Sequence, residues 1–508
     1  MRCNFYFFCF LLASNFLFAQ NVTFADPNFK ELFVSSFYDV NQDNEISYEE
    51  ALNIVFISQT SDLGITDLTG IEAMTNLESF TLRNNPISNP VDLSSNINLE
   101  RIDLSSHLST IPEFNISGLT NLIRLRVDGS FESIDLSNKP VLEHVRVISD
   151  ELQSIDVSGN PELKLLNVIA EQVDEIDISN NPLLQELLID RANITEIDMS
   201  QNNLIERLTL NSNELTSVDL SNLSQLTFLK ISSNFIGTID VSANPLLETL
   251  QLWNIGINEI DLENNPLIKQ LHLTYNDFTD GVDLSMQTLL EDFHCGGCNL
   301  DEIDFTNNLE LKYVHISSNK ITHIDFTELD KLEMLLVDGN KLVNLDLSNN
   351  SLLRYLHIGN SRDLQYVNIK NGNNHNMQYY QTQYSRLDSL LEACVDDPNS
   401  SFAWALNSYL PNSVNITSDC TPTASDYNIV MADKFNIYPN PVTEKLHIDT
   451  ELKIDSYKIY NSLGQVIKTG NLTAEKEYII NLNSLQAGYY MLYLETNKSS
   501  YSTPIIKK

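Results

Sequence analysis

An aspartate that returns every 21 residues is the feature that most constrains how this chain can fold. It stands in the phrase Ile-Asp-Leu-Ser and close variants, and one interval, between Asp261 and Asp283, is 22 residues long. The repeated aspartates are Asp135, Asp156, Asp177, Asp198, Asp219, Asp240, Asp261, Asp283, Asp304, Asp325 and Asp346. A fixed period of this length is typical of stacked coils in which each coil contacts only its neighbours. The sequence therefore predicts a solenoid rather than a compact globule.

Each repeat also carries a second phrase, in which two leucines alternate with a polar residue and an asparagine follows. Leu208-Thr209-Leu210 with Asn213 is one example. The alternation is typical of a short strand that points Leu208 and Leu210 inward and Thr209 outward. We expect the asparagine to point inward as well, where its amide can bond the backbone of neighbouring coils. Its counterparts are Asn234, Asn276 and Asn319.

This pattern, Leu-x-x-Leu-x-Leu-x-x-Asn, resembles that of the leucine-rich repeat family over roughly residues 60–371. The resemblance implies strands stacked in a parallel sheet on a concave face. Coils of 21 residues are short for an outer helix, so we expect an extended or turn-like convex side. The predicted fold class is mainly β: a leucine-rich repeat solenoid, with a small helical segment before it and an antiparallel β-sandwich after it.

The outward position of the concave strands predicts a contact surface. It is occupied in successive coils by Thr209, Lys230, Gln251, His272, His294, His315, Leu336 and His357. Trp253 lies two positions after Gln251 and also faces outward, and exposed aromatic side chains lead interface energetics. The candidate ligand-binding residues are Lys230, Gln251, Trp253, His272, His294, His315 and His357. Two alternatives stay open: histidine simply suits a half-exposed strand, or the imidazoles bind a transition metal, although no closed ligand set is evident.

The repeated aspartates form a second column. Eleven carboxylates stacked ~4.8 Å apart would each repel a neighbour by about 0.9 kcal/mol even at the dielectric of water. Hydrogen bonds from serine or turn amides of the same coil would offset this repulsion. A row of bound cations such as calcium is the alternative.

Twelve residues near the N-terminus predict a calcium loop. Oxygen-bearing side chains stand at the first, third, fifth, ninth and twelfth positions of Asp39–Glu50, which is EF-hand spacing. Asn44 replaces the usual glycine, and asparagine tolerates the left-handed backbone required there. The loop is single, so we expect one structural Ca²⁺ rather than a signalling sensor. The predicted ligands are Asp39, Asn41, Asp43, Glu45 (through its carbonyl), Ser47 and Glu50.

A short helix is expected before this loop. Asp26 is placed as its N-cap, with Pro27 in the first turn. One apolar stripe at helical spacing would face the core. The stripe consists of Phe29, Leu32, Phe33 and Phe37.

The first residues predict export. Arg2 precedes a short apolar run, and Ala19 offers a cleavage point, so residues 1–19 match a secretory signal, with a buried N-terminal strand as the alternative. No later apolar stretch approaches the length of a transmembrane helix.

Export permits disulfides among the four cysteines that follow the signal. Cys295 and Cys298 occupy inward positions of their coil, so we expect a buried structural pair, oxidised or not. Cys394 and Cys420 flank a segment of weak periodicity, and we predict that they pair.

The rhythm stops after residue 371, and the charge changes further on. Residues 434–508 hold 9 basic and 7 acidic residues, against 21 and 62 in residues 1–433. We expect residues 372–431 to form a disulfide-closed cap and linker, because solenoids need atypical ends; the segment resembles the cysteine-closed ends of secreted leucine-rich proteins with similar calcium loops.

The C-terminal residues 432–508 contain short alternating strands that predict a small antiparallel sandwich. The motifs Tyr-Pro-Asn-Pro, Leu-Gly-Gln and Ala-Gly-Tyr-Tyr, with a basic end, resemble the type A sorting domain of type IX secretion. The resemblance implies export through that machinery, followed by release or anchoring at the outer surface.

The predicted organisation is a signal (1–19), an EF-hand-like cap (20–57), a solenoid (58–371), a cap and linker (372–431) and a sorting domain (432–508). A net charge of −39 argues against nucleic acid and anionic lipid as partners. No nucleophile elbow, paired-carboxylate site or phosphate loop is present, so we do not expect an enzyme. We expect a secreted or cell-surface protein whose concave face recognises a protein or polysaccharide. The alternative is a structural or adhesive component that gathers divalent cations on its acidic array.

Overall fold

The computed structural model describes residues 20–378, 385–410, 414–420, 436–450, 453–454, 456–461, 466–472, 478–495 and 500–508. These residues belong to two compact units, Met1–Ser418 and Asp419–Lys508. The predicted signal at 1–19 and most of the predicted linker lie outside the described residues.

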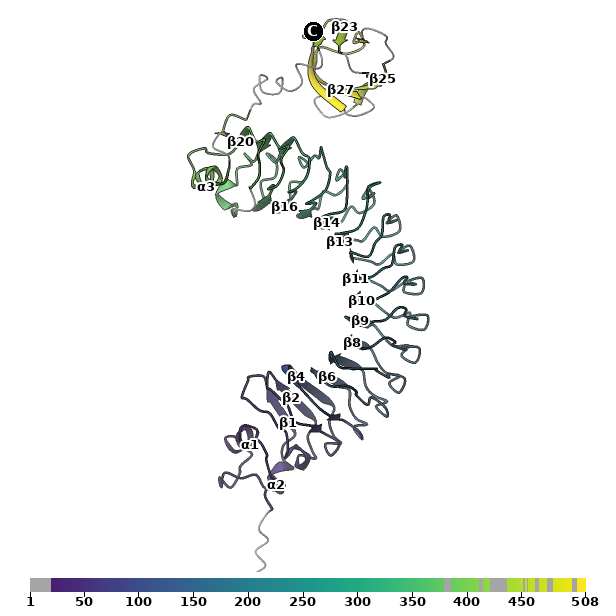
Figure 1. Cartoon of the computed structure of the whole chain (residues 1–508), viewed down its shortest axis with the longest axis vertical. Coiled ribbons are helices and arrows are strands. Elements are labelled where there is room, and N and C mark those ends of the chain that lie inside the picture. Colours follow the sequence, from purple (N-terminus) through teal and green to yellow (C-terminus); the bar gives the residue numbers. More distant parts are fainter. Residues whose placement is uncertain are drawn as a thin grey trace, which may run out of the picture. The chain divides into compact units, whose positions relative to one another are not determined.

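The first unit is built on one parallel sheet of 15 strands, and each strand comes from a successive coil. The coils stack along an arc with the strands on its inner side (Figure 1). The strands are β1 (Phe56–Gln59), β2 (Ser79–Arg83), β4 (Arg101–Thr110), β6 (Arg124–Ser130), β7 (His144–Ile148), β8 (Leu165–Ile169), β9 (Glu186–Asp190), β10 (Arg207–Asn211), β11 (Phe228–Ser232), β12 (Thr249–Trp253), β13 (Gln270–His272), β14 (Asp292–His294), β15 (Tyr313–His315), β16 (Met334–Leu336) and β18 (Tyr355–His357). The predicted leucine-rich repeat solenoid is confirmed.

The strand register explains the apolar period. Leu208 of β10 pairs with Leu229 of β11, which pairs with Leu250 of β12, and all three are buried. Thr209, between two buried leucines, is half-exposed on the inner face. Because each coil repeats the same inward positions, one continuous apolar core runs along the first unit. Between the strands the described residues of the repeats form turns and extended segments, as expected for coils this short.

Buried asparagines satisfy the backbone between coils. Asn213 is buried and donates to the Ile189 carbonyl of the preceding coil at 3.1 Å, which agrees with the sequence prediction. A second column of buried asparagines, between a repeated aspartate and the following strand, was not predicted. Asn181 is an example: its amide donates to the carbonyls of Val157 (2.9 Å) and Asn160 (2.8 Å). The members of this second column are Asn96, Asn160, Asn181, Asn202, Asn244, Asn265, Asn308 and Asn350.

The N-terminal end is covered by two short helices, α1 (Pro27–Val34) and α2 (Tyr48–Ala51). Asp26 caps α1 by accepting from the backbone of Asn28, as predicted. Phe29 and Phe33 are buried, but Phe37 lies beyond the end of α1 and is 76% exposed. The expectation that Phe37 faces the core was therefore wrong, because the helix ends before the stripe reaches it. Small additional elements are η1 (Ile71–Ala73), β3 (Val91–Asp92) and β5 (Phe114–Asn115).

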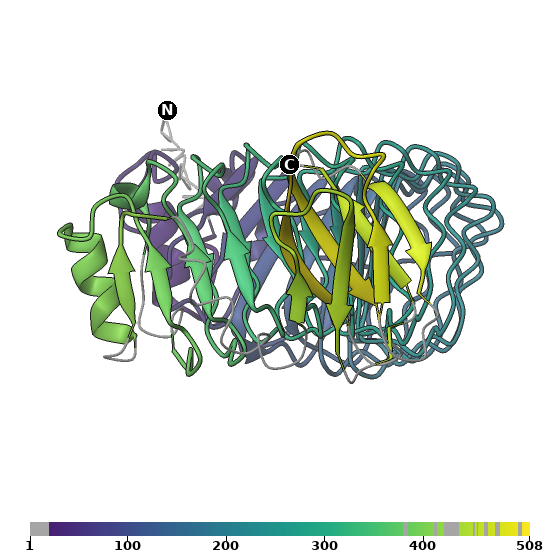
Figure 2. The ribbon, with the colours of Figure 1, turned by 90° about the horizontal axis from the view of Figure 1, so that it is seen from above.

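Parallel pairing continues beyond residue 371 in a second sheet of four strands. Helix α3 (Ser401–Tyr409) lies beside the last strands of this sheet (Figure 2). Coil-like stacking therefore extends into the segment that the sequence assigned to the cap. The strands are β17 (Asn344–Asp346), β19 (Tyr366–Asn368), β20 (Glu392–Cys394) and β21 (Asn415–Thr417), and a short helix, η2, covers Asn374–Asn376.

The second unit consists of two antiparallel sheets around its own apolar core, as predicted. Val442, Leu446, Ile459 and Leu492 are among its buried residues. One sheet contains β22 (Asn436–Tyr438), β23 (Lys445–Asp449) and β26 (Tyr478–Asn481). The other contains β24 (Ser456–Tyr460), β25 (Val466–Asn471), β27 (Gly488–Glu495) and β28 (Ser500–Lys507).

Candidate functional site

Three columns of the first unit carry the candidate sites. The outward column of the concave sheet is in continuous register from Thr209 to His357, so each histidine lies opposite the next outward side chain. His272 pairs with His294, and His294 pairs with His315. The parallel sheet thus brings together three histidines that are far apart in the sequence.

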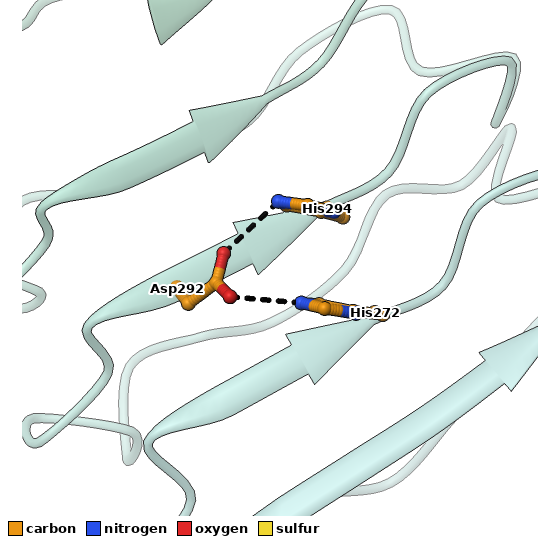
Figure 3. Close-up of side chains that lie close together, drawn as sticks. All are labelled: His272, Asp292 and His294. Carbon is orange, nitrogen blue, oxygen red and sulfur yellow. Dashed lines mark hydrogen bonds and ion pairs between the residues drawn. The ribbon is translucent and has the colours of Figure 1, made fainter. Parts of the chain in front are cut away.

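The closest cluster consists of His272, Asp292 and His294 (Figure 3). Nε2 of His272 lies 3.0 Å from one Asp292 carboxylate oxygen, and Nε2 of His294 lies 3.0 Å from the other. The two imidazole rings stack with centroids 4.0 Å apart and planes 7° apart. Burial alone would raise the pKa of Asp292, but its interactions with His272 and His294 outweigh burial and hold that pKa below its usual value.

Asp292 was missed in the sequence, although a signal for it was present. It stands two residues before His294 in β14, and side chains two apart on a strand share a face. Asp292 belongs to the neighbouring outward column, opposite Gln270, and not to the histidine column. The structure therefore adds a carboxylate to the predicted histidine row.

An aromatic pair lies beside the histidines. The rings of Trp253 and Tyr275 stack with centroids 6.2 Å apart, and both side chains are exposed. They line a hollow of about 460 Å³ on the concave face. We call its main side chains the histidine–aromatic patch: Lys230, Gln251, Trp253, His272, Tyr275, His294 and His315. Tyr275 is a member that the sequence analysis did not find.

The segment Cys295–Cys298 lies against two rings of this patch. Cys295 and Cys298 form a disulfide and are fully buried. A side chain at Gly296 would place Cβ 2.9 Å from Nε2 of His315, and one at Gly297 would place it 3.0 Å from the Tyr275 ring. The two rings therefore lie directly against glycine backbone, which only residues without a Cβ permit.

His315 is the half-buried histidine that follows His294 in the row. Its ring lies 5.3 Å from that of His294 in an edge-on arrangement. Burial, reinforced by the neighbouring His294, lowers the pKa of His315 from its ordinary value. His357 lies outside the hollow and pairs with Asp338 at 3.0 Å.

Nearer the N-terminus, the same outward columns of the concave sheet carry charged side chains. We call these side chains the arginine–aspartate ladder: Arg83, Asp103, Arg126, Asp128 and Arg146. Arg126 lies 3.8 Å from Asp103 and 3.5 Å from Asp128, and Arg146 lies 3.7 Å from Asp128. Asp128 is 3% exposed. Each carboxylate of the ladder therefore lies within ion-pair distance of two guanidinium groups.

The predicted calcium loop folds around two buried carboxylates. Asp39 accepts from the backbone amides of Asp43 (3.2 Å) and Asn44 (3.0 Å). Glu50 accepts from the amides of Val40 and Ser47, both at 2.9 Å. The Ser47 amide is the first cause of the lowered pKa of Glu50, partly opposed by burial. Asn44 has a φ of 62°, the left-handed conformation expected where an EF-hand has glycine.

The loop is also held from outside. The amide of Val22 donates to the Ile46 carbonyl at 2.7 Å, and Lys30 pairs with Glu45 at 2.6 Å. The donor set, oxygens only, suits Ca²⁺. Asp39, Asn41, Asp43, Ser47 and Glu50 would hold the ion with side-chain oxygens, and Glu45 with its carbonyl. The carboxylates are not as tightly gathered as the histidine cluster, which is the one group of three ligand atoms within 4.8 Å among the described residues. The calcium site stays a prediction.

The repeated aspartates are engaged within their own coils. Each of the eleven accepts, at 2.8 to 3.0 Å, from the backbone amide two residues later. In Asp219, the amide and hydroxyl of Ser221 lower the carboxyl pKa. This arrangement agrees with the local hydrogen-bond explanation of the column. Cys394 and Cys420 are both disulfide-bonded, and their pairing with each other stays a prediction.

Comparison with solved structures supports the fold. The functional domain of InlJ from Listeria monocytogenes, described as including a cysteine ladder, superposes with a TM-score of 0.64 at 22% identity, over 96% of this chain and 98% of that chain. A leucine-rich repeat protein of Leptospira interrogans gives 0.48 at 18% identity, over 73% and 97%. Internalin InlF from Listeria monocytogenes gives 0.42 at 18% identity, over 78% and 96%. At these identities the likeness concerns the fold alone.

Sequence comparison identifies the second unit. No curated protein matches the chain. Residues 436–508 match the family of secretion system C-terminal sorting domains, which confirms the predicted type IX sorting domain. Among the described residues, no helix is both long and apolar enough to cross a membrane. The chain is thus a leucine-rich repeat solenoid joined to a sorting domain, and it is a secreted protein or one anchored at the outer cell surface.

Proposed function

We propose that this protein is a non-catalytic binding protein whose concave face recognises a protein or polysaccharide outside the cell. The contact centre is the histidine–aromatic patch. The observation that carries the proposal is the hollow of about 460 Å³ beside the stacked rings of Trp253 and Tyr275. Exposed aromatic side chains that are already oriented give contact area at little cost in conformational entropy.

The surroundings of the aromatic pair support recognition by several kinds of contact. Lys230 and the three histidines of the patch supply hydrogen-bond donors and acceptors around the apolar rings. Such a mixture of a few polar groups with an apolar floor is typical of ligand sites. The patch spans strands β11 to β15 of one continuous sheet, so its side chains are held by rigid elements.

The test is a binding screen followed by two matched variants. The secreted protein is applied to arrays of extracellular proteins and glycans, and a confirmed ligand is titrated by calorimetry. We expect Trp253→Ala to weaken binding by about 30-fold or more, since a central aromatic contact contributes ~2 kcal/mol or more. Phe235→Ala is the control, because Phe235 is exposed but lies outside the patch.

Each outcome is informative. The proposal is supported if both variants keep the circular dichroism spectrum of the wild type and only Trp253→Ala loses ligand affinity. A ligand that binds both variants as tightly as the wild type would place its contacts elsewhere and refute the role of the patch. Turnover of a bound glycan or peptide would refute the non-catalytic part.

The cation-gathering alternative has weaker support. Each repeated aspartate already uses one oxygen for a backbone amide, so a cation row would have to be built on the remaining oxygens. Calcium titration that reveals many equivalents per chain would favour this alternative. One equivalent, lost in Glu50→Gln, would favour a single structural site in the N-terminal loop.

A further inference from the structure

The cluster of His272, Asp292 and His294 offers two nitrogen ligands and one carboxylate at the same point of the concave face. We propose that it is a binding site for a divalent transition metal ion, with zinc as the best match. The ligand atoms lie within 4.8 Å of one another, and no other described group of three meets this condition. Nitrogen and carboxylate ligands of this kind suit zinc, whereas calcium prefers oxygen alone.

The distances are close to those of a metal centre. Two ligands that each lie about 2.05 Å from a tetrahedral zinc ion are about 3.3 Å apart. Each imidazole Nε2 lies 3.0 Å from an oxygen of Asp292. Replacing the protons between these atoms by one ion therefore requires shifts of a few tenths of an ångström for the nitrogen–oxygen pairs.

One rearrangement is needed, and the structure leaves room for it. The imidazole planes are 7° apart and stacked, so their lone pairs run side by side rather than meeting. A single ion can accept both only after one ring tilts toward the other. The side chains of His272 and His294 are 23% and 26% exposed, and they border the hollow rather than packed core, so tilting is feasible.

The charge around the cluster also favours a cation. Asp292 is half-buried, and each of its carboxylate oxygens lies 3.0 Å from a histidine nitrogen. A carboxylate removed from water attracts a cation more strongly than an exposed one does. Three protein ligands leave open coordination positions, as in zinc sites that bind a further group. If a ligand donor fills them, the ion would take part in recognition; this last step rests on the proposed function, whereas binding of zinc does not.

Zinc titration of the full chain tests the site directly. The protein is stripped with a chelator, supplied with millimolar calcium to occupy oxygen-only sites, and titrated with zinc chloride by calorimetry. Cobalt(II) serves as a second probe, because its visible absorption reports nitrogen ligation. We expect one strong zinc equivalent. We expect the zinc affinity to fall by about 100-fold or more in Asp292→Asn and in His294→Ala. Loss of even an outer-sphere partner lowers metal affinity by roughly 10–100-fold.

His357→Ala is the matched control. His357 pairs with Asp338 at 3.0 Å, but this pair belongs to no group of three ligand atoms among the described residues. The zinc affinity of His357→Ala should equal that of the wild type. If His294→Ala perturbs the strand, Asp292→Asn still tests the site, because it changes the side chain without changing its shape. Three results would each overturn the proposal. They are equal zinc affinity in the wild type and Asp292→Asn, loss of zinc binding in His357→Ala, and no bound zinc in the wild type. Failure of the ligand screen with intact zinc binding would refute only the proposed function.

Discussion

The concave sheet carries two kinds of polar surface on one scaffold. From β2 to β7 the arginine–aspartate ladder fills it with permanently charged side chains that form ion pairs with one another. In β11 to β15 the same positions hold histidines, a tryptophan and glycines, and a hollow forms. The parallel register is continuous through both regions, so the two surfaces differ mainly in the side chains that the strands carry.

One repeat therefore serves stability in the ladder region and recognition in the patch region. Paired guanidinium and carboxylate groups already have partners, and an incoming ligand would have to replace those pairs. The exposed rings of Trp253 and Tyr275 hold no ion pair that a ligand must replace, so we expect contacts with them at smaller cost. We therefore assign stabilisation to the ladder and binding to the patch.

The largest expected effect concerns the end of the solenoid that precedes the ladder. Calcium at 100 times its dissociation constant should stabilise this end by about 2.7 kcal/mol. Hydrogen exchange should show slower exchange in α1, α2 and β1 with calcium than with a chelator, and no change in β13 to β15. Glu50→Gln should abolish the difference. Glu49→Gln is the control because the structure predicts no ligand role for Glu49, and an equal response in both variants would contradict a calcium site in this loop.

A smaller effect is expected within the ladder itself. Asp128→Ala removes a buried carboxylate that faces Arg126 and Arg146. Breaking a fully buried pair costs 3–5 kcal/mol, but both arginines are about one-third exposed, so we expect roughly 1–3 kcal/mol less unfolding free energy. Urea denaturation measures the change.

Asp190→Ala is the matched control for that experiment. Asp190 occupies the same register position three strands further along, through Ile148 and Ile169, and is half-buried. Its loss should cost less than that of Asp128. Equal destabilisation by the two variants would show that the ladder contributes nothing specific, which would break the comparison.

The sequence predicts the scaffold well because the physics of a repeat is local. A buried Leu208 implies a buried Leu229 once the period is known, and the Asp219 hydrogen bond recurs in every coil. The second asparagine column keeps the same period with gaps, and its signal in the sequence was the phrase Asn-Pro-Leu, which occurs at Asn181, Asn244 and Asn265.

The patch was predicted only in part, because it depends on departures from the repeat. The row from His272 to His315 followed from the register, but Asp292 and Tyr275 join it through neighbouring columns. The contact of His315 with Gly296 depends on ring orientation across coils, which no spacing specifies. The prediction that Phe37 is buried was wrong for a similar reason: the apolar spacing was helical, but α1 ends at Val34.

A modest effect is expected from adding one methyl group to the patch. Gly296→Ala would bring Cβ within 2.9 Å of the His315 ring, which must move into the hollow. We expect about tenfold weaker ligand binding and less than about 1 kcal/mol of destabilisation, because the ring end can shift. Gly159→Ala is the control, since its Cβ would meet no atom closer than 3.7 Å. Calorimetry should show a loss of ligand affinity in Gly296→Ala alone; equal affinities would mean that the position of His315 is irrelevant to binding.

The smallest expected effect is a pH response confined to the patch. Burial and the neighbouring His294 lower the pKa of His315 in the folded protein below its unfolded value. The contribution of His315 to the free energy of unfolding is therefore fully present above the unfolded pKa of about 6.5. It is lost as the pH falls through the folded pKa. Protonated His315 would be repelled by His294, His272 and His357 and attracted by Asp338. Hydrogen exchange in β15, corrected for intrinsic rates, should therefore speed up between pH 7.5 and 5, while β9 and β10, which contain no histidine, keep their protection. His315→Gln should remove the response of β15; a response that persists in this variant, or that appears equally in β9 and β10, would show that titration is not localised in the patch.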